Sequence, residues 1–298
     1  MTNREPDVSL ASAVAPPASS EPAPEAPAPV ARRLPPLTLP RIAWARVGIR
    51  IAAVVGLIAI WHMATTYDWN VYLEFENVPG PTAVWAEFAS LITEPLFHTH
   101  IIVSLHRIAT AFLLATVMGV TLGTLMGRYR VMQDVFVPYI ELFRPIPAVA
   151  WIPLAILMLP TEESSIVFIT FLGAFFPIVL NTVHGVDQTP PGLVRAARAL
   201  GASNASILWH VVLPGALPSI VAGLAIGMGV AWFSLLAGEI ISGQYGIGYF
   251  TWRAYTLIEY PRIIIGMITI GLLGTLSTLL VRALARPLLR WQRTSDQH

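Results

Sequence analysis

The sequence of 298 residues contains no cysteine, and each of its 18 basic residues is an arginine. The absence of cysteine excludes disulfides, iron–sulfur clusters and metal sites with thiolate ligands. The absence of lysine excludes a phosphate-binding P-loop, which ends in Gly-Lys-Ser or Gly-Lys-Thr. This sequence therefore carries no P-loop ATPase of its own.

Charge is also scarce. Charged residues make up 12% of the chain against 55% hydrophobic residues, and the mean hydropathy is positive. A water-soluble fold with this composition would be difficult to keep in solution. The composition therefore predicts an all-α integral membrane protein.

The first 40 residues differ from the rest. They hold ten of the 25 prolines and many alanines, and they contain no apolar run. Such a segment buries too little surface to offset its chain entropy. We expect residues 1–40 to form a disordered tail and residues 41–298 to form one membrane domain.

Six apolar stretches follow, each near the roughly 20 residues that a helix needs to cross a bilayer. The third is interrupted by Glu141, Arg144, Pro145, Pro147 and Pro153. The sequence predicts six membrane-spanning helices, at approximately 47–66, 101–126, 137–159, 164–185, 215–238 and 262–284.

Arginines gather in alternate segments between these stretches, and acidic residues gather in the others. Only Arg253 and Arg262 blur the pattern. The positive-inside rule then places both termini, and the segment 194–214, in the cytoplasm. The arginines are Arg32, Arg33, Arg41, Arg46, Arg50, Arg128, Arg130, Arg195, Arg198, Arg282, Arg286, Arg290 and Arg293, and the acids are Asp68, Glu74, Glu76, Glu87, Glu94, Glu162 and Glu163.

Glycines recur at intervals of four within two of the apolar stretches. They are Gly119, Gly123 and Gly127 in one stretch and Gly223 and Gly227 in another. Small residues at this spacing let helix backbones approach closely. We expect them to serve tight packing within the bundle.

The segment "VRAARALGASNASILWHVVLP", residues 194–214, separates two apolar stretches. Its first half has Leu193, Ala196, Ala197 and Leu200 at helical spacing, and Gly201 suits a helix stop. In its second half Ser203 or Asn204 can cap a short helix with an apolar stripe of Ile207, Leu208 and Val211, ended by Pro214. The pattern predicts two surface helices joined at a glycine, and composition alone leaves open an amphipathic hairpin that rests on lipid headgroups.

This segment resembles the EAA loop of the permease subunits of bacterial ABC importers. The matching residues are Ala196, Ala197, Gly201, Val211, Leu213 and Pro214, while Arg195 replaces the glutamate that usually opens the motif. The resemblance implies a coupling helix, between the fourth and fifth spans, that docks on a cytoplasmic ATPase. The residues it assigns to that contact are Arg195, Ala196, Ala197, Arg198, Gly201, Ala202 and Pro214.

The resemblance covers about residues 75–292 and is strongest to the permeases of nitrate, sulfonate, taurine and bicarbonate importers. It rests on ordered blocks that include "LFRPIPAVAWIPLAI", "FFPIVLNTVHGV" and "GIGYFTWRAY". It implies a non-catalytic subunit of the bacterial inner membrane that forms half of an anion pathway. The implied partners are two ATPase subunits that bind ATP and Mg, a second and identical permease subunit, and an external binding protein. It implies no cofactor on this chain and no nucleic acid.

Four residues are candidates for the pathway itself: Arg107, Trp232, Ser234 and Glu239. An ionisable residue at membrane depth is a functional candidate by default. The structural alternatives are an arginine paired with an acid, an aromatic packed in the bundle, and an acid that holds a helix in place. We favour the last role, or that of a gate, for Glu239, because an acid repels an anion.

Other polar residues have simpler interpretations. Glu141 and Arg144 stand three apart and are expected to form a local ion pair. His98, His100 and His106 have neither thiolate nor neighbouring carboxylate, so we expect no metal site there.

Three other classes of protein stay open. An ion-coupled secondary transporter would use buried carboxylates or unwound half-helices at the midplane. A membrane-embedded enzyme would need a cluster of catalytic side chains. A non-transporting anchor would leave the match to the loop unexplained.

Overall fold

The computed structural model describes residues 41–67, 69 and 77–292, and these contain helices and no strand. The all-α prediction is therefore confirmed for them. The predicted tail, residues 1–40, lies outside the described residues. The chain divides into two units, Met1–Ala53 and Val54–His298. The described part of the first unit is helical, and the second unit contains the helices that form the candidate sites.

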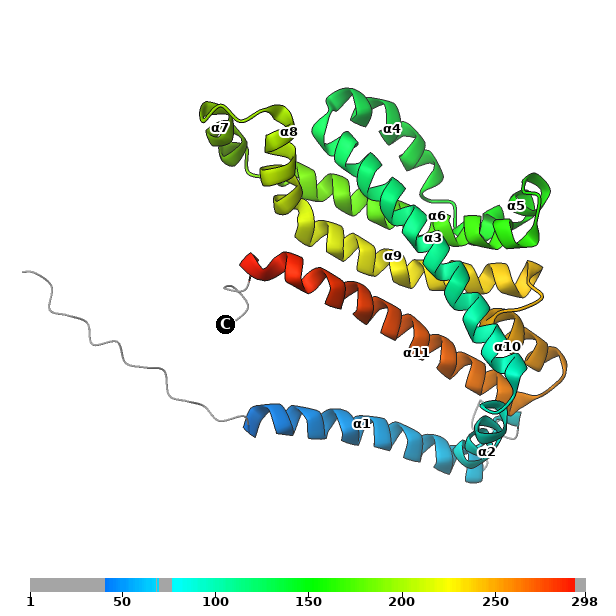
Figure 1. Ribbon diagram of the computed structural model, residues 1–298. Coiled ribbons are helices and arrows are strands. Elements are labelled where there is room, and N and C mark those ends of the chain that lie inside the picture. The colour runs from blue at the N-terminus through cyan, green and yellow to red at the C-terminus, as the bar shows by residue number, and fades with distance from the viewer. Residues whose placement is uncertain (1–40, 68, 70–76, 293–298) are drawn as a thin grey trace, which may run out of the picture. The chain divides into compact units, whose positions relative to one another are not determined.

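The helices are labelled as in Figure 1. They are α1 (Arg41–Thr66), α2 (Pro81–Leu91), α3 (Pro95–Arg128), α4 (Arg130–Phe143), α5 (Ile152–Met158), α6 (Glu162–Asp187), α7 (Pro191–Ala199), α8 (Asn204–Ile207), α9 (Leu213–Ser242), α10 (Ile247–Thr256) and α11 (Tyr260–Ala285). The short helices α2 and α10 were not predicted from the sequence.

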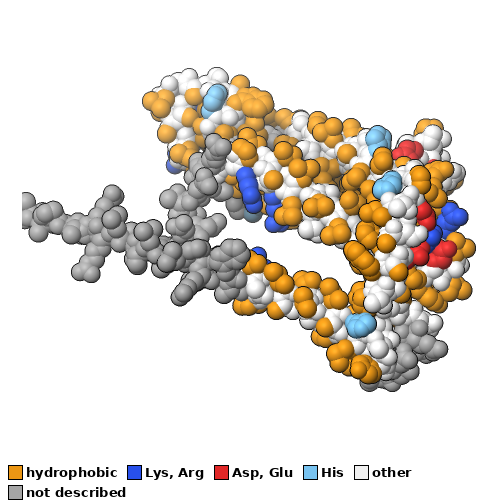
Figure 2. All heavy atoms as spheres, turned by 60° about the horizontal axis from the view of Figure 1, so that its bottom comes forward, with side chains coloured by type: hydrophobic (Ala, Val, Ile, Leu, Met, Phe, Trp, Pro, Cys, Tyr) orange, Lys and Arg blue, Asp and Glu red, His pale blue; other side chains and the backbone are white. Residues whose placement is uncertain are grey.

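Among the described residues, five helical stretches are long and apolar enough to cross a membrane. Their bounds are Val47–Thr66, Pro95–Arg128, Glu162–Asp187, Asn204–Ile241 and Tyr260–Leu289. Each contains one of the predicted spans. Figure 2 shows apolar side chains over much of the visible surface, while the acidic side chains seen there lie together at one end. Such a surface suits a protein whose sides face lipid.

The predicted span at 137–159 is broken where the sequence had placed interruptions. Helix α4 ends at Phe143, and the helical stretch Ala148–Met158 continues at an angle of 88° to it. Pro145 and Pro147 lie between them; proline has no N–H to donate, and it disfavours helical geometry in the residue before it. The described residues therefore hold five candidate spans, or six if the bent pair counts as one.

Helix α6 packs against both α3 and α9, and glycines make these contacts close. A Cβ atom added to Gly123 of α3 would lie 2.6 Å from Cβ of Thr182 in α6, and one added to Gly223 of α9 would lie 2.6 Å from Cβ of Asn181. Real Cβ contacts are longer, so any side chain here would push the helices apart. The predicted packing role of these glycines is confirmed.

Replacing Gly123 with valine is therefore expected to destabilise the bundle. Overpacking of a close contact costs roughly 1–3 kcal/mol, and here backbone atoms on α6 leave little room to adjust. The thermal unfolding midpoint of the detergent-purified protein should fall. Gly271→Ala is the matched control, because an added Cβ meets nothing within 4 Å there. Equal midpoints for the two variants would contradict the close packing.

Candidate functional site: an exposed helical turn and a buried ion network

The segment 191–214 forms two helical pieces joined at a glycine turn. Helix α7 ends at Ala199, and Gly201 has φ of 81°, a left-handed conformation that favours glycine. Its N–H donates to the carbonyl of Arg198 at 3.0 Å, and that of Ala202 donates to Ala197 at 3.1 Å. Ser203 then caps α8, because its hydroxyl accepts from the N–H of Ser206. The predicted helix, glycine turn and helix are therefore present.

The surface of α7 differs from the expected apolar face. Val194 and Ala197 pack against the buried cluster around Ile207. Leu193 and Leu200 are instead exposed, Leu200 to 89%. The predicted contact residues of this segment are placed as follows: Arg195, Ala196, Arg198 and Gly201 are exposed, and Ala197, Ala202 and Pro214 are half-buried. The helix thus presents two arginines and two leucines outward.

The sequence indicated that the second helical piece ends at Pro214, but in the structure it continues past this residue. Helix α8 continues through a π-helical turn, Leu208–Val212, directly into α9, and Pro214 lies in the first turn of α9. A π turn widens the backbone and accommodates proline's missing donor. The candidate contact segment is therefore joined to a membrane-spanning helix without an intervening loop.

At the other end of α9, Glu239 lies in a buried ion network. Its side chain is fully buried, and Oε1 accepts from Nη1 of Arg107 at 3.1 Å and from the hydroxyl of Ser104 at 2.7 Å. Its second oxygen accepts from the N–H of Gly248 at 2.9 Å. Glu239 therefore holds α9 to α3 and to the start of α10.

Arg107, on α3, extends the network to α6. Its side chain is 6% exposed, and its Nη2 lies 2.6 Å from Oε2 of Glu163, at the start of α6. A further donor reaches the carbonyl of Tyr245 at 2.7 Å. Arg107 was a candidate either for contact with the cargo or for pairing with an acid, and in the structure it is paired with acids. Its cationic donors are used within the protein.

The turn between α9 and α10 fits closely against this network. Gly246 has φ of 120°, and a Cβ atom on it would overlap the carboxylate of Glu239. Its N–H donates to Nδ1 of His100 at 3.0 Å, and the next N–H, of Ile247, donates to Ser104 at 2.9 Å. His100 thus has a structural contact here, and His98 lies 2.8 Å from the carbonyl of Ile92.

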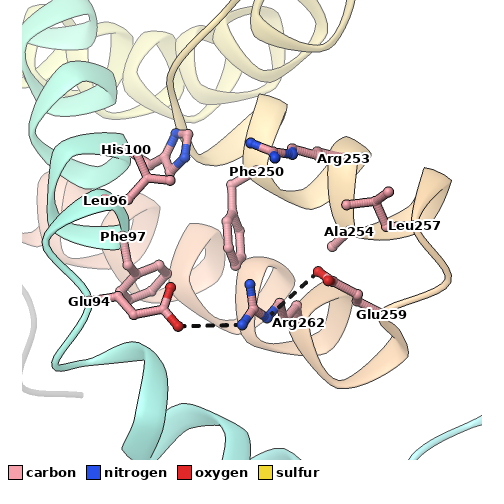
Figure 3. A pocket seen from close by; sticks show the side chains of 10 residues that line it. All are labelled: Glu94, Leu96, Phe97, His100, Phe250, Arg253, Ala254, Leu257, Glu259 and Arg262. Atoms are coloured by element: carbon pink, nitrogen blue, oxygen red, sulfur yellow. Dashed lines mark hydrogen bonds and ion pairs between the residues drawn. The ribbon is translucent and has the colours of Figure 1, made fainter.

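A second ion cluster lies near the same end. Arg262 contacts Glu87 at 2.6 Å, Glu94 at 3.4 Å and Glu259 at 3.6 Å. Figure 3 shows Arg262 between Glu94 and Glu259 at the edge of a small pocket of about 110 Å³. In the sequence, Arg262 was an exception to the alternation of arginine-rich and acidic segments. In the structure its charge is paired with three acids.

The two remaining pathway candidates lie on α9 and are both buried. Trp232 is 4% exposed and packs in the main apolar cluster with Ile108 and Leu235. Ser234 is fully buried and lines a groove of about 400 Å³ between α6 and α9. The packing interpretation therefore fits Trp232, while Ser234 also borders an open space.

Sequence reasoning missed several members of these clusters. Ser104, Glu163 and Gly246 were not assigned to the network, and no local pattern indicates them, since 56 residues separate Arg107 from Glu163. The expected pair of Glu141 and Arg144 is absent from the ion pairs of the described residues. Arg144 caps α4 with helical backbone geometry, and its N–H donates to the carbonyl of Ile140, but its side chain lines a groove instead of pairing with Glu141.

Comparison with known proteins identifies the family to which this sequence is similar. Residues 115–293 match the family described as binding-protein-dependent transport system inner membrane component. A probable ABC transporter permease of Brucella abortus is 37% identical over 72% of this chain and 86% of its own length. The nitrate import permease NrtB of Synechocystis is 34% identical over 75% and 82%. The putative aliphatic sulfonates transport permease SsuC of Escherichia coli is 34% identical over 80% and 89%. The chain belongs to this family, the multi-pass inner-membrane permease subunits of ABC importers.

Proposed function

We propose that the chain forms half of the membrane pathway of an ATP-driven importer of a small oxyanion. Its partners would be a second copy of itself, two cytoplasmic ATPase subunits and an extracytoplasmic binding protein. The observation that carries the coupling part of this proposal is the continuity of α8 with α9. An exposed element that leads without a loop into a membrane helix is suited to transmit an applied movement.

The contact surface for the ATPase would be α7 with the Gly201 turn. Exposed Leu193 and Leu200 offer apolar area, and Arg195 and Arg198 offer positive charge. Because Arg195 stands where the family usually has glutamate, we infer that the ATPase presents an acidic residue to it. ATP and Mg would be bound by that partner, and this chain would perform no covalent chemistry.

Charge supports an orientation with both termini in the cytoplasm. α7 and its arginines lie at one end of α6 and α9, whereas the acids that bind Arg107 and Arg262 lie at the other end. With Arg262 matched by acids, the positive-inside rule favours the α7 end as cytoplasmic. The binding protein would then deliver its cargo at the end that carries Glu163 and α10.

The cargo class follows from relatives whose names specify nitrate and aliphatic sulfonates. Both anions carry negative charge spread over oxygen atoms. A secondary transporter gains no support, because Glu239 is the only buried carboxylate among the described residues and it is paired with Arg107.

Vesicle transport tests the proposal. The chain, coexpressed with the ATPase and binding protein of its own gene neighbourhood and reconstituted, should accumulate labelled nitrate or taurine only when ATP is present with the ATPase. The chain alone should accumulate neither under a proton or sodium gradient. Uptake driven by an ion gradient in the absence of the ATPase would contradict the proposal and favour a secondary transporter.

A further inference from the structure

Arg144 lies at the bend between α4 and the helical stretch that begins at Ala148. It lines the groove of about 400 Å³ whose other walls are the middle of α6, from Leu172 to Leu180, and the middle of α9, from Val230 to Ser234. Figure 1 shows this bend beside α6. The arginine is therefore held at the depth of the bundle's midpoint by a break in the helix.

Among the residues that the structure describes, no acidic side chain pairs with Arg144. The ion pairs of the described residues include Arg107 and Arg262 but not Arg144, although its side chain is exposed to the groove. A cation at membrane depth is costly and normally pairs with an acid or lines a water-filled path. An unpaired arginine in a half-open groove is thus arranged to meet an anion that comes from outside the protein.

Two residues in the walls of the same groove, Trp151 and Ser234, carry buried polar groups. The indole Nε1 of Trp151 and the hydroxyl of Ser234 are shielded from solvent and make no hydrogen bond with the described residues. A buried donor without a partner is energetically unfavourable. Ser234 fits tightly against Gly173 of α6, where a Cβ atom would overlap its hydroxyl. These two donors are covered by the protein itself, so the guanidinium of Arg144 is the charged group of this groove that an anion can reach.

We propose that Arg144 forms an oxyanion-binding site at the middle of the membrane pathway, in the groove whose walls include Trp151 and Ser234. The planar guanidinium matches the paired oxygens of a nitrate, carboxylate or sulfonate group. Arg107 is not suited to this role, because Glu163 and Glu239 already neutralise it. The identification of this anion with the transported cargo rests on the proposed function.

The absence of cysteine allows a direct test in the assembled transporter. Phe233 lines the groove and is 66% exposed, so Phe233→Cys introduces the only thiol of this chain. We would measure its rate of modification by the anionic 2-sulfonatoethyl and the cationic 2-trimethylammonioethyl methanethiosulfonates. Relative to its reaction with a free thiol in solution, the anionic reagent should be favoured over the cationic one, and nitrate or methanesulfonate should slow it more than chloride at equal ionic strength.

Adding Arg144→Gln to Phe233→Cys should lower the anionic-to-cationic rate ratio by roughly an order of magnitude, because a nearby unit charge in a partly dry groove sets the local probe concentration. It should also remove the protection by nitrate. Arg144→Lys should keep the rate ratio but weaken the protection. Glu141→Gln is the matched control: it removes a charge on neighbouring α4 outside the groove lining and should leave both measurements unchanged.

An unchanged rate ratio in Arg144→Gln, or no labelling of Phe233→Cys at all, would overturn this inference. Neither result depends on transport. If the vesicles take up nitrate while Arg144→Gln leaves labelling and uptake unchanged, only the site is refuted. If labelling depends on Arg144 but no ATP-driven uptake occurs, the site stands and the proposed function fails.

Discussion

Replacing Gly201 with proline is expected to reduce ATP-driven uptake to background while the protein still inserts into the membrane. Proline fixes φ near −65°, whereas this position has φ of 81°. Proline also removes the N–H that donates to the carbonyl of Arg198. The turn must then open, and α7 loses its orientation relative to α8. Uptake of labelled substrate and copurification of the ATPase measure the two parts of this effect.

The control at the same position is Gly201→Asn, because asparagine tolerates the left-handed conformation better than other side chains. This variant should retain most of the uptake and the bound ATPase. The helices behind the turn should be intact in both variants, as judged by their expression and circular dichroism. Normal uptake by Gly201→Pro would show that the segment is not the coupling surface.

The second large effect is expected at the buried ion network. Glu239→Ala leaves Arg107 with only the partly exposed Glu163 as an acidic partner and leaves the N–H of Gly248 without its acceptor. Removing one partner of a buried ion pair typically costs about 3–5 kcal/mol. The thermal unfolding midpoint should fall strongly, and the turn before α10 should become accessible to protease. Glu239→Gln, which keeps the shape, should lose less.

A double-mutant cycle distinguishes pairing from simple cavity formation. Arg107→Ala together with Glu239→Ala should destabilise the protein by clearly less than the sum of the single effects, since the second change removes a charge that the first has left unpaired. Glu162→Ala, at the neighbouring residue to Glu163, should be close to neutral. Additive costs in the cycle would show that the two side chains act independently.

The sequence was sufficient for those parts of the fold that depend on local composition. Five spans follow from runs of about 20 apolar residues, and the turn at Gly201 follows from a glycine between two helical patterns. The bend at 144–147 was signalled by its prolines, but its angle depends on how α5 packs against α6. The continuation of α8 into α9 was not predicted, because a proline such as Pro214 ordinarily indicates a helix boundary.

The polar clusters were the least predictable part. Arg107, Glu163 and Glu239 come from three helices that are far apart in the chain, and only the packing of α3, α6 and α9 brings them together. For the same reason local spacing predicted a partner for Arg144 on its own helix, Glu141. The ion pairs of the described residues do not include these two side chains, and Arg144 lines a groove that was not predictable from local spacing.

The π-helical turn Leu208–Val212 has a mechanical consequence. Because α8 and α9 form one continuous helical stretch, no loop separates the Gly201 turn from Glu239, some 38 residues further along. In the proposed function, the contacts of Glu239 and the position of α7 would therefore be linked, and linkage of this kind acts in both directions. Weakening the contacts of Glu239 should make α7 easier to displace.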